Sequence, residues 1–286
     1  VAGTHGKTTT TAMLAKVLGG AGLKPTVLVG SLLAEGGSNF LSGDTVETPW
    51  GLRRYLVVEA CEYRRSFLDL VPSMVVITNI EEDHLDYFKD LADIESAFTE
   101  LVAKVHPESG VCITSTDVTR RLFATHGHPM SQGNPWTSDV HVLICDGVAV
   151  EGLTLLVPGL HNVENAKAVL AAARVLGVPH ERAVASLNDF CGTWRRFEYK
   201  GRIGASGAVV YDDYAHHPSE IRATLQGARE LFPTQEIIAV FQPHLFSRTR
   251  QLFDGFARNF FDADEVLIAD CDLSKVEKTR REWPFL

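Results

Sequence analysis

Short β-branched apolar runs alternate with segments of helical periodicity along most of the chain, and this alternation constrains the fold more than any other feature. Four runs predict buried strands, in KPTVLVGS, YLVVEACE, SMVVITNI and GVCITS (residues 24–31, 55–62, 73–80 and 110–115). Two segments predict helices, residues 9–22 and 93–105, and in the second Ile94, Phe98 and Leu101 share one face. Strands that alternate with helices favour a mostly parallel sheet covered by helices, so the predicted fold class is α/β.

A second α/β series follows a break in the pattern near Gly192. Its predicted elements are a strand, a helix, a strand, a helix and a strand, at residues 207–215, 219–232, 236–243, 248–261 and 265–270. We therefore predict a central domain over residues 1–192 and a smaller, incomplete Rossmann-like α/β domain over residues 193–286, with an atypical tail from about residue 271.

Composition excludes several classes of protein. The 286 residues are 45% hydrophobic and carry a net charge of −9, which disfavours a nucleic-acid surface binder because phosphate backbones attract basic patches. No apolar run approaches the ~18 residues that span a bilayer. The five cysteines are far apart and show neither a C-x-x-C pair nor zinc spacing. We expect a cytoplasmic protein that binds neither nucleic acid nor a membrane.

A glycine-rich turn opens the chain, in VAGTHGKTTTTAML, and it predicts a phosphate-binding loop. In such a loop the glycines let backbone N–H groups point inward, the following helix adds its positive end, Lys7 neutralises terminal phosphates, and the Thr8 hydroxyl reaches Mg²⁺. The turn departs from the common G-x-x-x-x-G-K-[ST] pattern because Val1 stands where the first glycine would be. An ordinary turn before a helix is the alternative.

Acidic and imidazole side chains follow two of the predicted strands. Glu59 and Glu62 end the apolar run VVEACEY, and Asp83, His84 and Asp86 crowd the loop after Asn79 in TNIEEDHLDYF. The carboxyl ends of parallel strands are where open α/β sheets bind ligands. These side chains would suit a site for a metal ion and phosphate, and solvated strand ends are the alternative.

Amide side chains lie near the start of the predicted helix at residues 158–178, after a predicted β-hairpin at Asp146-Gly147. His161, Asn162 and Asn165 lie in its first turns. Asn162 could be the helix N-cap. Asn165 lies one turn further in, where an amide suits the edge of an adenine base.

Titratable groups also crowd two adjacent strand ends of the second series. The first loop, YDDYAHHPSE, holds Asp212, Asp213, Tyr214, His216 and His217. The second, FQPHLFSRTR, holds Gln242, His244, Arg248 and Arg250. Two such loops side by side predict a substrate cleft. Arg195 and Arg196 at the domain boundary could reach a phosphate when the domains close.

Taken in order, GTHGKTTTT, EACEYRRSFL, TNIEEDHLDYF, GLHNVENA, RRFE, DDYAHHPSEI and FQPHLFSRT resemble the motifs of the Mur ligase family, from residue 1 to about residue 270. The sequences of these motifs are most similar to those of the family members that add L-alanine. The resemblance implies a P-loop-type domain and an ATP-dependent ligase of peptidoglycan precursor synthesis. The lactyl carboxylate of UDP-N-acetylmuramate would attack the γ-phosphate of ATP, and L-alanine would attack the resulting acyl phosphate, with phosphate leaving.

The resemblance also implies site residues. For nucleotide binding they are Gly3, Thr4, His5, Gly6, Lys7, Thr8, Thr9, His161, Asn162, Asn165, Arg196 and Asp212. For Mg²⁺ they are Thr8 and Glu59 at one ion and His84 at a second. For the substrate carboxylate and the incoming alanine they are Tyr214, His216, His244 and Arg248. The expected catalytic residues are Lys7, His84, Arg196, His216 and Arg248.

Two departures and two rival functions accompany this resemblance. The family's N-terminal UDP-binding domain and the strand before Val1 are not in the sequence. The last residues, from about residue 271, do not resemble the usual family sequence. We therefore expect a fragment that is inactive alone. The rivals are a recycling ligase that joins murein tripeptide to the same sugar nucleotide, and a non-catalytic P-loop nucleotide-binding protein.

Overall fold

The computed structural model describes residues 1–34, 36–106, 110–124, 141–204 and 207–269. These residues divide into two compact units, Val1–Asp213 and a unit that begins at Tyr214, and each is described by itself. None of the helices in the described ranges combines the length and the apolar character needed to cross a bilayer.

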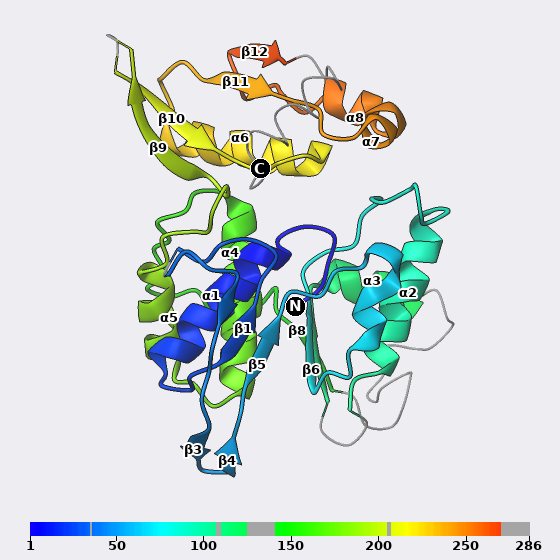
Figure 1. Cartoon of the computed structure of the whole chain (residues 1–286), viewed down its shortest axis with the longest axis vertical. Coiled ribbons are helices and arrows are strands. Elements are labelled where there is room, and N and C mark those ends of the chain that lie inside the picture. Colours follow the sequence, from blue (N-terminus) through cyan, green and yellow to red (C-terminus); the bar gives the residue numbers. More distant parts are fainter. Residues whose placement is uncertain (35, 107–109, 125–140, 205–206, 270–286) are drawn as a thin grey trace. The chain divides into compact units, whose positions relative to one another are not determined.

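A mostly parallel sheet forms the centre of the first unit (Figure 1). Its two sets of strands have the orders β2-β1-β5 and β6-β7-β8. The strands are β1 (Thr26–Leu28), β2 (Phe40–Leu41), β5 (Leu56–Val58), β6 (Met74–Ile77), β7 (Val111–Thr114) and β8 (His141–Ile144). Every pairing among them is parallel except β1 with β2. The prediction of an α/β fold with a mostly parallel sheet is confirmed.

The first two residues join these two sets of strands. The Ala2 amide donates to the Val76 carbonyl (2.8 Å), and the Ala60 amide donates to the Val1 carbonyl (2.8 Å). Val1 and Ala2 therefore lie between β5 and β6 as a short strand segment. The glycine-rich turn follows this segment directly, so it lies at the carboxyl edge of the sheet.

Helices cover both faces of the sheet (Figure 1). One face packs against α1 (Lys7–Gly20), α4 (Leu160–Val175) and α5 (His180–Asn188). The other packs against η1 (Tyr63–Asp69), α2 (Leu91–Ala103) and α3 (Thr116–Ala124). In β6, Val76 belongs to the first cluster, whereas Val75 and Ile77 belong to the second. This alternation is the period of two that places successive strand side chains on opposite faces.

Several elements of the first unit differ from the sequence prediction or were not predicted. The hairpin predicted at Asp146-Gly147 is wrong, because among the described residues β8 pairs only with β7 and no strand follows the turn over residues 145–158. Val148 and Val150 pack against the core cluster instead, which explains their alternation without a ladder. The unpredicted elements are β2, η1, α3, α5, the antiparallel pair β3 (Val46–Thr48) and β4 (Gly51–Arg53), and β9 (Glu198–Ile203), which pairs with β10 (Ala208–Asp212).

The described residues of the second unit, 214–269, form a parallel pair of strands and three helices. Its elements are α6 (Pro218–Leu231), β11 (Ile238–Phe241), α7 (Phe246–Gln251), α8 (Phe253–Ala257) and β12 (Glu265–Ile268). Ile221, Leu225 and Phe256 form its core. The single helix predicted at residues 248–261 is instead two helices that meet at Leu252.

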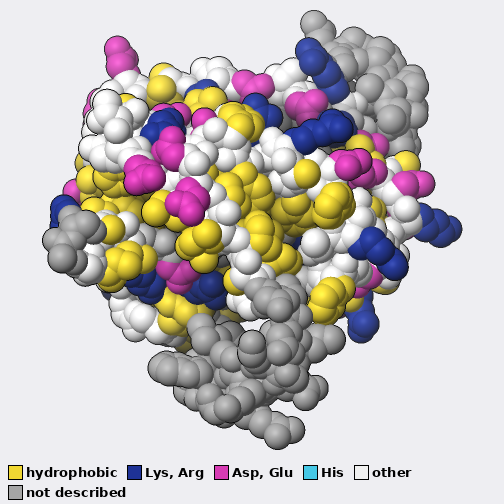
Figure 2. All heavy atoms as spheres, turned by 90° about the horizontal axis from the view of Figure 1, so that it is seen from above, with side chains coloured by type: hydrophobic (Ala, Val, Ile, Leu, Met, Phe, Trp, Pro, Cys, Tyr) yellow, Lys and Arg dark blue, Asp and Glu magenta, His cyan; other side chains and the backbone are white. Residues whose placement is uncertain are grey.

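The sheet of this unit leaves apolar side chains exposed, and Figure 2 shows hydrophobic side chains gathered over β11 and β12. Val240 is 72% exposed, and its partner in the strand register, Leu267, is 48% exposed. Ala239 and Phe241, which alternate with Val240, pack toward the core of the unit.

Phe98→Ala is expected to destabilise the first unit strongly. The Phe98 side chain is fully buried in α2, and its ring meets that of Phe67 edge to face, with the ring centroids 5.2 Å apart. The substitution should lower the free energy of unfolding by about 3–5 kcal/mol, because it leaves a cavity. Urea denaturation followed by circular dichroism measures the loss. Phe40→Ala, at a half-exposed position of β2, is the matched control and should change stability by less than about 1 kcal/mol. Equal losses in both variants would contradict this assignment of the core.

Candidate functional site

The glycine-rich turn is shaped by contacts that only glycine allows. Gly3 and Gly6 have positive φ angles of 131° and 78°. A Cβ atom on Gly3 would lie 2.0 Å from the Thr78 hydroxyl, and one on Gly6 would lie 2.6 Å from Oδ1 of Asn165. The turn therefore lies against the end of β6 on one side and against α4 on the other, and neither glycine position has room for a side chain.

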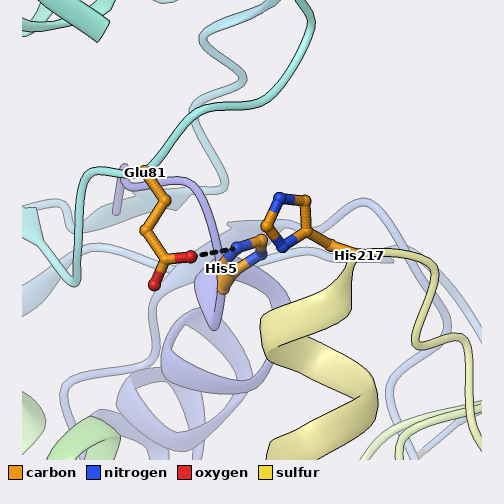
Figure 3. Close-up of side chains that lie close together, drawn as sticks. All are labelled: His5, Glu81 and His217. Atoms are coloured by element: carbon orange, nitrogen blue, oxygen red, sulfur yellow. Dashed lines mark ion pairs between the residues drawn. The ribbon is translucent and has the colours of Figure 1, made fainter. Parts of the chain in front are cut away.

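Asn79 fixes the middle of the turn. The Thr4 amide donates to the Asn79 carbonyl (3.0 Å), and the His5 amide donates to its side-chain Oδ1 (2.8 Å). The His5 imidazole lies 3.5 Å from a carboxylate oxygen of Glu81, which follows β6 (Figure 3). The turn is thus tied to the loop that the sequence marked as carrying Asp83, His84 and Asp86.

Lys7, the first residue of α1, is enclosed by the turn. Its ammonium donates to the carbonyls of Gly3 (2.7 Å) and Thr4 (2.9 Å) and to the carboxylate of Glu62 (3.0 Å). The side chain of Lys7 is 14% exposed and that of Glu62 is 3% exposed. The sequence offered Glu62, with Glu59, as a carboxylate suited to a metal site, and it did not predict this ion pair with Lys7. Its 55-residue separation from Lys7 is why the ion pair could not be predicted.

Thr8 and Glu59 meet as the resemblance implied for a metal site. The Thr8 hydroxyl donates to Oε1 of Glu59 (2.8 Å), and the Gly30 amide donates to Oε2. A hydroxyl and a carboxylate are the hard oxygen ligands that Mg²⁺ prefers, so this pair fits that ion. Thr9 follows on the first turn of α1 and is buried.

His84 lies beside Glu62, next to the enclosed lysine. Its Nε2 is 3.9 Å from Oε1 of Glu62 and 3.8 Å from a carboxylate oxygen of Asp83. Its ring lies 4.7 Å from that of Tyr63 between centroids, and its backbone has a positive φ of 53°. Imidazole nitrogen suits transition metals better than Mg²⁺, so the role of His84 at a second Mg²⁺ stays a prediction.

Cys61 lies between the two carboxylates in sequence but does not fit a nucleophile. Burial raises the pKa of its thiol, and the charge of Glu62 raises it further. Because the thiolate is the nucleophilic form, a raised pKa makes the thiol less reactive at neutral pH.

The amide residues of α4 reach the glycine-rich turn through Asn165. Helix α4 is capped by Gly159, and Asn162 lies within its first turn, so the N-cap alternative for Asn162 is wrong. The side-chain amide of Asn162 donates to the Pro158 carbonyl (2.7 Å), and that of Asn165 donates to Asn162 (3.4 Å). Both are buried, whereas His161 is exposed, and the contact of these three residues with a nucleotide base stays a prediction.

Asp212 forms an ion pair with Arg195. Nε of Arg195 lies 3.0 Å from Oδ2 of Asp212, and Arg195 has a positive φ of 54°. The backbone amide of Arg196 donates to the Thr193 carbonyl (3.1 Å). The sequence offered Arg195, together with Arg196, as an arginine that could reach a phosphate when the domains close, and its pairing with Asp212 became visible only in the structure.

Three rings gather in the second unit. The Tyr214 hydroxyl lies 3.2 Å from Nε2 of His244, and Nδ1 of His216 lies 2.8 Å from the Tyr214 carbonyl. The three ring centroids lie 4.9–6.3 Å apart. His217 caps α6 by accepting from the Ser219 amide, and Arg248 is buried in α7. The structure thus brings together three of the four residues expected to bind substrate.

Comparison with known proteins gives a consistent result. Residues 1–173 match the model of the Mur ligase middle domain, and residues 195–282 match that of the Mur ligase glutamate ligase domain. The UDP-N-acetylmuramate–L-alanine ligase of Desulfitobacterium hafniense is 43% identical, over 94% of this chain and 61% of its own length. That of Salinibacter ruber is 42% identical, over 94% and 58%. The chain therefore spans less than two thirds of the length of these curated relatives.

Solved structures agree in fold. The crystal structure of the UDP-N-acetylmuramate–alanine ligase of Thermotoga maritima has a TM-score of 0.67 and 28% identity, covering 98% of this chain and 64% of that one. A murein peptide ligase of Psychrobacter arcticus has a TM-score of 0.65 and 24% identity, covering 99% and 66%.

Proposed function

This chain belongs to the Mur ligase family, and on that premise we propose that it forms the ATP-binding part of a ligase that joins L-alanine to UDP-N-acetylmuramate. The observation that carries the proposal is the phosphate-loop lysine, Lys7, enclosed beside the Thr8–Glu59 pair at the carboxyl edge of a parallel sheet. That edge is where open α/β sheets bind ligands. The choice of alanine and of the sugar nucleotide is supported by the names of the most similar curated relatives.

The proposed reaction has two steps and belongs to peptidoglycan precursor synthesis. An oxygen of the lactyl carboxylate attacks the γ-phosphorus of ATP, the bond to the bridging oxygen breaks, and ADP leaves. The amino group of L-alanine then attacks the acyl carbon, phosphate leaves with the former carboxylate oxygen, and the nitrogen gives up a proton. Both steps bring anions together, so positive charge must stabilise them.

We propose the following roles for the residues of the first unit. The Gly3–Gly6 turn and Lys7 would hold the β- and γ-phosphates. Thr8 and Glu59 would hold one Mg²⁺, which when bound supplies positive charge to the phosphates. His84 would act near the γ-phosphate. The remaining nucleotide contacts would come from Thr9, His161, Asn162, Asn165, Arg196 and Asp212.

For the second unit we propose contact with the reacting groups of the substrates. His216 and Arg248 would assist catalysis near the substrate carboxylate, with Tyr214 and His244 beside them. The clustering of the Tyr214, His216 and His244 rings supports a common role.

We propose residues 1–192 and 193–286 as the two domains, because the match to the first family model ends at residue 173 and the match to the second begins at residue 195. The first compact unit of the structure, Val1–Asp213, instead includes β9 and β10. Since ATP and nucleotide sugars are cytoplasmic, we propose that location.

The test is an ADP-release assay on the natural gene product that contains these residues, with ATP, Mg²⁺ and UDP-N-acetylmuramate. We expect ADP to form when L-alanine is added and not when it is omitted. L-Alanyl-γ-D-glutamyl-meso-diaminopimelate, offered separately, is the competing acceptor. ADP formed only with that tripeptide would replace the proposal with a recycling ligase. ATP binding without ADP formation in any mixture would favour a non-catalytic nucleotide-binding protein.

A further inference from the structure

We propose that Glu62 competes with nucleotide phosphate for Lys7, so that the phosphate loop is held closed by an internal carboxylate until ATP displaces it. This inference rests on the proposed nucleotide site and concerns a residue to which neither the resemblance nor the comparisons assign a role. It is carried by three properties of the Lys7–Glu62 pair, namely its hydrogen bonding, its burial and its charge.

The first property is that the Lys7 ammonium is already saturated. An ammonium group has three N–H donors, and Lys7 has three acceptors within 3.0 Å: the carbonyls of Gly3 and Thr4 and the carboxylate of Glu62. A phosphate oxygen that binds Lys7 must therefore replace one of them. The two carbonyls belong to the turn itself and are fixed by its backbone. The Glu62 side chain is the acceptor that can rotate away.

The second property is that the Glu62 carboxylate is shielded from solvent water. Its side chain is 3% exposed, and both of its oxygens lie within 3.0 Å of the Lys7 ammonium. A buried ion pair interacts more strongly than an exposed one, because the surrounding dielectric is lower. Breaking the Lys7–Glu62 ion pair to bind phosphate therefore costs free energy, and this cost weakens nucleotide binding.

The third property is the charge that remains after the exchange. A phosphate next to Lys7 lies close to the Glu62 carboxylate, and two buried anions repel each other. His84 lies 3.9 Å from Oε1 of Glu62 and provides the next polar partner for a displaced carboxylate. If Glu62 instead positioned Lys7 for phosphate, its removal would weaken nucleotide binding. The two roles thus predict opposite signs.

The test is isothermal titration calorimetry of the full chain with ATP and with inorganic triphosphate, both in EDTA so that no metal screens the carboxylate. Glu62→Gln keeps the shape and removes the charge, and it should bind both probes about tenfold more tightly than the wild type, which corresponds to ~1.4 kcal/mol. Glu62→Asp keeps the charge but shortens the reach by one methylene group, and its affinity should lie between the two. It also provides a second folded variant if Glu62→Gln fails to fold.

Glu82→Gln is the matched control, since it removes one negative charge from an exposed position in the loop after β6. Its affinity should stay within about twofold of the wild type, because an exposed charge is screened by salt. Unchanged or weaker binding by Glu62→Gln would overturn the inference, as would an equal gain in Glu82→Gln. If the wild type binds no ATP even with Mg²⁺, the proposed nucleotide site fails and this inference fails with it. If it binds MgATP and Glu62→Gln gains nothing in EDTA, only the inference fails.

Discussion

Lys7→Ala is expected to reduce ATP-dependent turnover by at least about 10²-fold, the typical loss when one preorganised charge at a developing anion is removed. Lys7 lies in the phosphate turn with its ammonium held by the turn's own carbonyls. Without it, the negative charge that develops at the γ-phosphate loses its nearest positive group. The measurement is ADP release by the natural gene product, together with the dissociation constant for MgATP.

The controls for Lys7→Ala separate catalysis from folding. Removing Lys7 alone leaves the buried Glu62 carboxylate without its partner, which can cost about 3–5 kcal/mol of stability. The double variant Lys7→Ala/Glu62→Gln removes both charges and should still lack turnover. Lys104→Ala, at the exposed end of α2, should leave turnover unchanged. Turnover by the double variant within a few-fold of the wild type would show that the loop has been misassigned.

Gly6→Ala is expected to abolish nucleotide binding while the rest of the chain stays folded. The new methyl group would lie 2.6 Å from Oδ1 of Asn165, at a backbone φ of 78° that alanine rarely adopts. The methyl group must displace the Asn165 amide or the turn, and the φ of 78° strains the turn, so we expect its amides no longer to converge on a phosphate. Calorimetric titration with MgATP measures the loss, and circular dichroism verifies the fold.

Gly22→Ala is the control for Gly6→Ala, because Gly22 has a similar φ of 79° and no atom within 4 Å of the added methyl group. In both variants alanine must adopt a left-handed backbone conformation, which destabilises the fold by about 1–2 kcal/mol. Only Gly6→Ala meets Asn165, so only it should lose MgATP binding. Equal affinity in the two variants would mean that the contact between the turn and α4 does not shape the phosphate site.

The strands β1, β5, β6 and β7 and the helices α1 and α2 were predictable because their signal is local. Hydrophobic side chains that recur every two or every 3.6 residues can be recognised within one short segment, and turn residues bound each such segment. The same local signal failed at Val148 and Val150, where alternation came from an extended segment packed on the core rather than from a strand pair. Helix α5 and the β3–β4 pair were not predicted at all.

The candidate site shows the same division. The sequence identified Lys7, Thr8, Glu59 and His84, because each follows a strand or a glycine turn in a pattern with a known chemical use. It also placed Tyr214, His216 and His244 on neighbouring loops, and the structure brings their rings together. It offered Glu62 as a candidate metal-site carboxylate but did not predict that Glu62 pairs with Lys7, nor that Arg195 pairs with Asp212.

The sequence by itself thus determined the α/β class, the phosphate turn and the residue types at the sheet edge, since all of these follow from short-range pattern. Only the tertiary structure decided which carboxylate meets which cation. Lys7 and Glu62 are 55 residues apart, and Thr8 and Glu59 are 51 apart. Their pairing depends on Val1 and Ala2 lying between β5 and β6, and strand order is set by the packing of the whole sheet rather than by any one segment.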